Sequence, residues 1–139
     1  MEPDNDQSED EITTKQEDRA IRLAVKQFFE GIRSLDAELI SAIFHPHSSS
    51  FSVTPRGICI EPAETWPRII EQAKADSAHL FRERFSVRIL GTDIVGTVAT
   101  AKVEWTFESA RIVDFYNLLK TEGMWLIVNQ VYHTFILRE

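Results

Sequence analysis

Four polar side chains stand among apolar residues in the segment RIVDFYNLLKTEGMWLIVNQVYH, which covers residues 111–133: Asp114, Tyr116, Asn129 and His133. The alternation of side chains on either side of Glu122-Gly123 predicts two antiparallel strands joined by a two-residue turn. A polar group in such a strand either faces water or lines a cavity, where it needs a hydrogen-bond partner. The pattern therefore makes these four residues candidates for ligand binding or catalysis.

The register of the predicted hairpins decides which side chains share a face. A turn at Glu122-Gly123 places Asn129 and His133 on the face that carries Asp114 and Tyr116. A second turn, at Glu108-Ser109, brings Trp105 to that same face. Because a slip of one residue would move a whole strand's side chains to the opposite face, this assignment depends on both turns.

Asp114 has the strongest potential for chemistry. On an apolar face its charged form is disfavoured, so we expect its pKa to rise. A carboxylate of this kind can act as a general base that removes a proton beside a carbonyl group. The structural alternative is that Asp114 only accepts hydrogen bonds from the backbone, from Arg68 or from a histidine. Tyr116, Asn129 and His133 can likewise bind a ligand or satisfy one another in a closed network.

Other candidate residues lie outside this segment. His45 and His47 flank Pro46, but two imidazoles without a nearby cysteine or carboxylate are too few for a zinc site. We therefore expect no metal, and the absence of phosphate-loop and dinucleotide motifs predicts no cofactor. His45 remains a candidate ligand contact, as does Trp66, which is predicted to lie on a helix over the mouth of the cavity.

Composition and charge narrow the class of protein. The chain has 139 residues, of which 43% are hydrophobic and 27% charged, so one domain with a real core is expected. Its net charge of -7, without a basic stripe, argues against a nucleic-acid partner. No apolar run is long enough to span a membrane, and no signal peptide is recognisable. The single cysteine, Cys59, fits a reducing cytoplasm, and cytoplasmic location is the expectation.

The first half of the chain predicts helices. Residues 1–15 are acidic and nearly devoid of apolar groups, which predicts a flexible tail ahead of a domain over residues 16–139. A capping box at Thr14 predicts the start of an amphipathic helix that ends near Gly31. Ser34 or Asp36 can cap a second, short helix that reaches His45-Pro46. A third helix begins at Pro62, or at Pro67 if that proline does not kink it.

The strands follow a different periodicity. Residues 49–60 predict two short strands around the turn Pro55-Arg56-Gly57. From about His79 the period changes to two, with turns at Gly96, Ser109 and Gly123, which predicts four longer antiparallel strands. Helices that are separate from an antiparallel sheet define an α+β fold.

The second face of the predicted sheet is also apolar. A patch of this kind on a soluble monomer usually marks an interface, and on a sheet it favours a two-fold homodimer. The alternative is that the N-terminal tail or a further helix covers it. The residues of the predicted interface are Val113, Phe115, Leu119, Leu126, Val128 and Tyr132.

The sequence resembles the nuclear transport factor 2-like superfamily, and within it the "putative lumazine-binding" proteins. The resemblance covers nearly everything after residue 17. It is carried by Phe44-His45-Pro46, by residues 53–57, by Trp66, and by three strand motifs: Ala99-x-Ala101-x-Val103, Asp114-Phe115-Tyr116-x-Leu118-Leu119 and Gly123-x-Trp125-x-Ile127-Val128-Asn129-x-Val131-x-His133. The resemblance implies three helices on the concave face of a strongly curved, mostly antiparallel sheet (a cystatin-like cone), a pocket between them and dimerisation through the sheet.

Three functions follow as hypotheses. The favoured one is a homodimeric domain that binds a small molecule in a pocket walled by the helices and the polar cluster. The second is a cofactor-free isomerase or dehydratase that uses Asp114, as the resemblance to ketosteroid isomerase and SnoaL-type cyclases suggests at the level of fold. The third is a dimerisation module whose cavity is filled by side chains.

Overall fold

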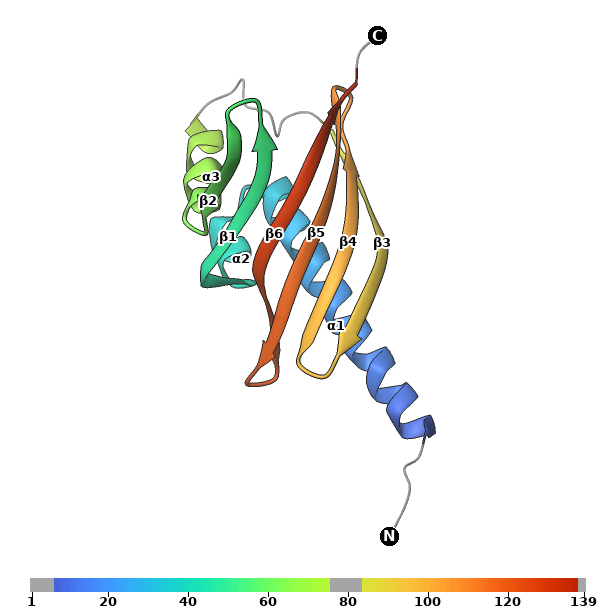
Figure 1. Ribbon diagram of the computed structural model, residues 1–139. Coiled ribbons are helices and arrows are strands. Elements are labelled where there is room, and N and C mark those ends of the chain that lie inside the picture. The colour runs from blue at the N-terminus through green and yellow to red at the C-terminus, as the bar shows by residue number, and fades with distance from the viewer. Residues whose placement is uncertain (1–6, 76–83, 138–139) are drawn as a thin grey trace.

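The computed structural model describes residues 7–75 and 84–137. Within these ranges three helices pack on one face of a six-stranded sheet with the order β2-β1-β6-β5-β4-β3, shown in Figure 1. All neighbouring strands are antiparallel except β1 and β6, which are parallel. The predicted α+β cone is confirmed. Its elements are α1 (Gln7–Ser34), α2 (Ala37–Ser41), β1 (Phe44–Thr54), β2 (Gly57–Pro62), α3 (Thr65–Ala75), β3 (Ser86–Val95), β4 (Val98–Thr106), β5 (Ala110–Thr121) and β6 (Met124–Ile136).

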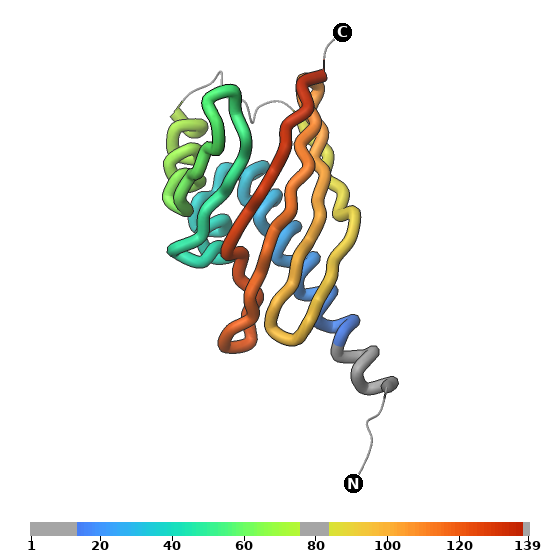
Figure 2. Tube along the Cα trace, viewed as in Figure 1, coloured from blue at the N-terminus to red at the C-terminus, as the bar shows by residue number. Residues whose placement is uncertain are grey.

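The long helix α1 runs across the back of the sheet, whereas α2 and α3 lie beside the β1–β2 hairpin (Figures 1 and 2). The apolar stripe predicted for α1 is buried, because residues three and four apart fall on one helical face. The stripe consists of Ile21, Ala24, Val25, Phe28, Phe29 and Ile32. The helix begins at Gln7, seven residues before the predicted capping box at Thr14, so the predicted start is wrong.

Two carboxylates anchor α1 to the strands. Glu17 accepts a hydrogen bond from the indole of Trp125 at 2.7 Å and another from Lys120. Asp18 accepts one from the hydroxyl of Thr92 and pairs with Arg22 at 2.9 Å. The Lys120 contact is the main cause that lowers the pKa of Glu17. These contacts attach α1 to β3 at one side of the four-stranded meander and to β5 and β6 at the other.

Gly31 does not end α1, contrary to the prediction. A Cβ at this position would lie 2.6 Å from Cγ1 of Ile40 on α2, so the glycine permits close packing of the two helices. The helix continues to Ser34, and the chain reverses at Leu35, whose φ is 55°. Asp36 then caps α2, as predicted, by accepting a hydrogen bond from the backbone N–H of Leu39 at 3.1 Å.

The helix α2 is shorter than predicted. It ends at Ser41, and Phe44 already belongs to β1, which extends through His45 and Pro46. The helix α3 begins at Thr65, so Pro67 lies in its first turn, where a missing N–H costs nothing. The predicted kink at Pro67 is therefore not needed, and Pro62 ends β2 instead of starting the helix.

The four-stranded meander was predicted with its turns. Gly96 and Gly123 occupy turns with positive φ, 56° and 78°, which glycine adopts without strain. The predicted start near His79 lies outside the described residues, and β3 begins at Ser86. The sheet carries register shifts in β1, β3 and β6, and bulges of this kind bend strands. They account for the curvature that encloses α1.

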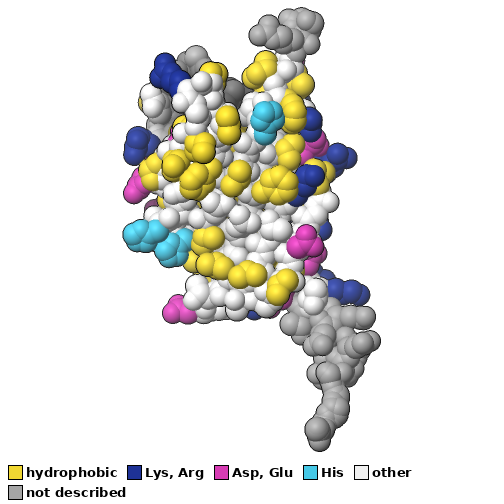
Figure 3. Space-filling view, viewed as in Figure 1, with side chains coloured by type: hydrophobic (Ala, Val, Ile, Leu, Met, Phe, Trp, Pro, Cys, Tyr) yellow, Lys and Arg dark blue, Asp and Glu magenta, His cyan; other side chains and the backbone are white. Residues whose placement is uncertain are grey.

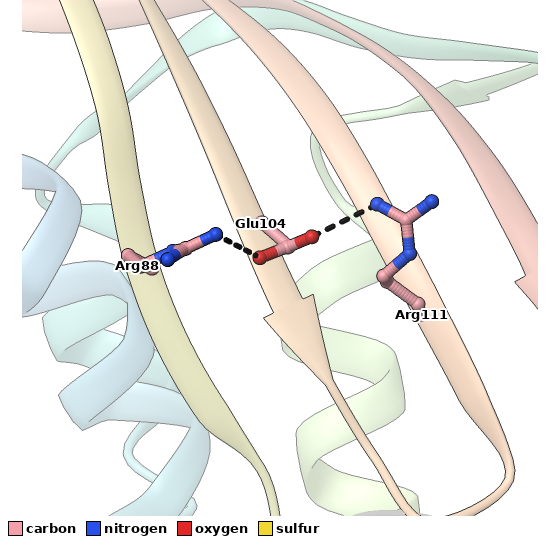
Figure 4. Close-up of polar contacts among 3 residues, drawn as sticks. All are labelled: Arg88, Glu104 and Arg111. Carbon is pink, nitrogen blue, oxygen red and sulfur yellow. Dashed lines mark hydrogen bonds and ion pairs between the residues drawn. The ribbon is translucent and has the colours of Figure 1, made fainter.

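The outer face of the sheet combines apolar and charged side chains. Figure 3 shows hydrophobic side chains gathered over β1, β6 and β5 on the face turned away from α1. Beside them Glu104 of β4 bridges Arg88 of β3 at 3.2 Å and Arg111 of β5 at 2.8 Å (Figure 4). The hydrogen bond from Arg111 is the main cause that lowers the pKa of Glu104. The carboxylate of Glu104 thus offsets one of the two positive charges beside it.

Across residues 7–75 and 84–137, no helix combines the length and the apolar character needed to cross a bilayer.

Candidate functional site

The β4–β5 hairpin has the predicted register. Trp105 pairs with Ile112 and Val103 pairs with Asp114, as the turn at Glu108-Ser109 requires. Asp114 and Tyr116 are both completely buried, on the face that packs against the helices. Trp105 is 3% exposed on the same face. The β4–β5 hairpin therefore brings three of the predicted residues together.

The β5–β6 hairpin departs from the prediction halfway along. Leu118 pairs with Ile127 as expected, but Asn117 pairs with Asn129, so Val128 is an extra residue on β6. From this bulge onwards every side chain of β6 moves to the opposite face. The predicted face of Asn129 and His133 is therefore wrong, and Gln130 and Tyr132 take their places beside Tyr116 and Asp114.

The displaced residues have partners on the outer face. Asn129 accepts a hydrogen bond from the amide of Asn117 at 2.8 Å. His133 is exposed and its ring lies 4.6 Å from that of Phe135, centroid to centroid. Neither lines the cavity beside Asp114. The sequence contains a signal of the bulge, because the five consecutive apolar residues from Met124 to Val128 break the alternation.

Asp114 is the centre of a buried hydrogen-bond network. Its Oδ2 accepts from the indole N–H of Trp105 at 2.7 Å and from the hydroxyl of Tyr116 at 3.1 Å. Its Oδ1 accepts from the amide of Gln130 at 2.9 Å. All three donors are neutral, and none is the arginine or histidine considered from the sequence. The carboxylate is thus fixed in orientation without an opposite charge.

Burial and the hydrogen-bond network together shift the pKa values of Asp114 and Tyr116. Burial raises the pKa of Asp114 to about 6, against the lowering effect of the hydrogen bonds from Gln130, Tyr116 and Trp105. The predicted direction is confirmed. Burial also raises the pKa of Tyr116 well above its ordinary value, and the charge of Asp114 acts in the same direction. Tyr116 therefore remains a donor, whereas Asp114 can exchange a proton near neutral pH or bind a cationic group.

A cavity of about 160 Å³ opens beside Asp114, between α3 and the sheet. Asp114 and Gln130 form its buried part, whereas Ser50, Glu61 and Thr65 are partly exposed. Aromatic and aliphatic side chains make up the rest of the wall, and Trp66 is among them. These are Trp66, Ile69, Trp105, Phe107, Ile112 and Tyr132.

Gln130, which lines this cavity, has an unused acceptor. Its Nε2 donates to Asp114, but its buried Oε1 accepts no hydrogen bond, although the residue is only 3% exposed. Buried polar atoms normally have a partner, so an orphaned oxygen in a cavity indicates a place where a ligand or water donates. The sequence prediction missed Gln130, Tyr132 and Glu61, because the first two depend on the bulge and the third on the β1–β2 hairpin.

His45 lies away from the Asp114 cavity. It borders a separate hollow of about 270 Å³ together with Phe44, Pro46 and Pro67. Its Nδ1 accepts the backbone N–H of His47 at 3.0 Å, and the two imidazole rings are 5.6 Å apart. In the described part of the chain no three metal-ligating side chains come together.

Solved structures with the same fold define the class of protein. A nuclear transport factor 2-like protein of unknown function from Shewanella baltica is 28% identical, with a TM-score of 0.74 over 86% of this chain and 94% of that one. Another, from Silicibacter pomeroyi, is 22% identical, with a TM-score of 0.74 over 88% and 98%. A ketosteroid isomerase-like protein from Erwinia carotovora atroseptica has a TM-score of 0.62 over 84% and 94% at 10% identity, and so shows the fold alone.

The sequence itself assigns the family. Residues 16–133 match the model of the family described as "Putative lumazine-binding". This chain is therefore a member of that family within the nuclear transport factor 2-like superfamily. No curated protein matches the sequence.

Proposed function

We propose that the protein binds a small organic molecule in the cavity beside Asp114. The observation that carries this proposal is the buried, oriented carboxylate of Asp114 beside a cavity that is also lined by Gln130, whose amide oxygen has no partner. Polar groups that converge in a mostly apolar cavity are typical of ligand sites. The volume of about 160 Å³ suits a single ring, since a cavity of about 150 Å³ in another protein holds benzene.

Filling the cavity tests this function. We expect Ile112→Trp to weaken the binding of single-ring compounds at least about tenfold, or ~1.4 kcal/mol, because the indole occupies the ligand's volume. The measurement is thermal shift followed by calorimetry on the hits. Val95→Trp is the matched control, because Val95 is an exposed residue of β3 that lines neither this cavity nor the groove on the outer face. Hits that bind Ile112→Trp as tightly as the unmodified protein would refute the cavity as the site, and a screen without hits would favour the dimerisation module.

We further propose that two copies associate through the outer face of the sheet. An apolar groove of about 650 Å³ lies there, and Phe115, Leu119 and Val131 are each more than 40% exposed. Most of the residues predicted for this interface do lie on the outer face, but Tyr132 belongs to the inner one because of the bulge. The occupant we propose is a second copy, because the face is apolar and a two-fold axis can place Phe115, Leu119 and Val131 against the same residues of a partner.

A charge in the middle of this face should separate the copies. We expect Phe115→Glu to weaken self-association by at least about 30-fold, or ~2 kcal/mol, because it removes a central apolar anchor and buries a carboxylate. Light scattering over a dilution series measures the effect. Leu23→Glu introduces the same charge at an exposed position of α1 and should change nothing. If Phe115→Glu and the unmodified protein have the same mass at every concentration, the outer face is not the interface.

A further inference from the structure

Two carboxylates line the Asp114 cavity, and no cationic side chain is among its described lining residues. Asp114 lies at its buried end and Glu61 at its partly exposed end. None of the described lining residues is lysine, arginine or histidine, and none of the ion pairs within the described ranges includes Asp114. A buried carboxylate without a counter-charge is unfavourable, and a cationic ligand would supply that charge. An anionic ligand would instead meet two like charges.

The free acceptors of the cavity match the donors of an ammonium group. Three hydrogen bonds reach Asp114, whereas a carboxylate offers about four acceptor positions. The Oε1 of Gln130 accepts none. An ammonium group carries donors only, so it can donate to a carboxylate oxygen of Asp114 and to Oε1 of Gln130 without leaving an acceptor of its own unpaired.

The remaining wall is suited to the body of such a ligand. Trp66, Trp105, Phe107 and Tyr132 line the cavity, and the faces of aromatic rings attract cations. Ile69 and Ile112 add aliphatic surface for an uncharged ring or chain. A small amine would therefore place its charge among carboxylates and rings and its apolar part among the aliphatic groups.

We infer that the ligand of this cavity is a small protonated amine with one ring or a short apolar chain. The inference rests on the proposed small-molecule binding and adds its chemical class. It is distinct from that proposal in what it excludes, namely carboxylate and phosphate ligands of similar size.

Three ligands of similar shape and different charge test the inference. Benzylamine, benzyl alcohol and benzoate are titrated against the full chain by calorimetry at about pH 7.5, where an amine is protonated and a carboxylic acid ionised. We expect benzylamine to bind at least about tenfold more tightly than benzyl alcohol, because its hydrogen bonds to Asp114 and Gln130 are charge-assisted. Benzoate should bind more weakly than either.

Substitutions within the cavity assign the selectivity to its carboxylates. Asp114→Asn should reduce the affinity for benzylamine to that for benzyl alcohol, and circular dichroism verifies that this variant is folded. Glu61→Gln, at the partly exposed rim, should reduce it about threefold without a risk to the fold. Glu108→Gln removes the same charge at an exposed turn outside the cavity and serves as the matched control.

The outcomes separate this inference from the proposed function. Benzyl alcohol or benzoate bound as tightly as benzylamine would overturn the amine class but leave small-molecule binding intact. Benzylamine affinity that is unchanged in both Asp114→Asn and Glu61→Gln would overturn it as well. If none of the three binds, the amine class is wrong, and the proposed function fails too only if the ring-compound screen gives no hit that Ile112→Trp weakens.

Discussion

Phe28→Ala is expected to lower the free energy of unfolding by about 3–5 kcal/mol, the range for truncating a buried phenylalanine. Phe28 is completely buried, and its ring makes edge contacts with those of Phe29, Phe44, Trp66 and Tyr116, with centroids 4.8–5.9 Å apart. This one side chain joins α1 to β1, α3 and β5. Its loss leaves a cavity that rigid neighbours cannot fill, in addition to the lost burial of apolar surface.

Urea denaturation at a fixed protein concentration measures this effect, since self-association would make stability depend on concentration. Leu23→Ala is the matched control, because Leu23 belongs to the same helix but is 60% exposed. We expect it to change stability by no more than about 0.5 kcal/mol. A loss below about 1 kcal/mol in Phe28→Ala would show that the aromatic cluster does not hold the helices to the sheet.

The second large effect concerns pH. The pKa of Asp114 rises from an ordinary 3.8 to about 6 because of burial, so the folded protein binds this proton more tightly than the unfolded chain does. Its contribution to stability is therefore fully present below about pH 4 and is lost as the pH rises through about 6. One pKa unit corresponds to about 1.4 kcal/mol, so we expect a loss of about 3 kcal/mol between about pH 4 and 7.5.

The comparison with Asp114→Asn isolates this contribution, because asparagine does not titrate. The free energy of unfolding of the unmodified protein, minus that of the variant, should decrease by about 3 kcal/mol over this range. Glu17, Asp18 and Glu104 have lowered pKa values and act in the opposite direction, but they do so in both proteins and cancel. A difference that is constant with pH, or that increases, would contradict the raised pKa of Asp114.

Most of the fold could be predicted because its signals are local. The apolar stripe of α1 follows from three- and four-residue spacing, and the β4–β5 register follows from one two-residue turn. The cap at Asp36 and the glycine turns at Gly96 and Gly123 depend on backbone preferences of single residues. The helix boundaries were less accurate. Gly31 was interpreted as a helix end, whereas its role is to let Ile40 approach from another helix.

The sequence by itself determined that a carboxylate, a tyrosine and a tryptophan would share a buried face, since Asp114, Tyr116 and Trp105 are linked by one tight turn. Only the tertiary structure decided which residues of β6 join them. The bulge at Val128 exchanges Asn129 and His133 for Gln130 and Tyr132, because one unpaired residue reverses every later side chain of a strand. The rim at Glu61 and the wall at Trp66 likewise come from segments distant in the chain, which only the packing of α3 and the β1–β2 hairpin brings to Asp114.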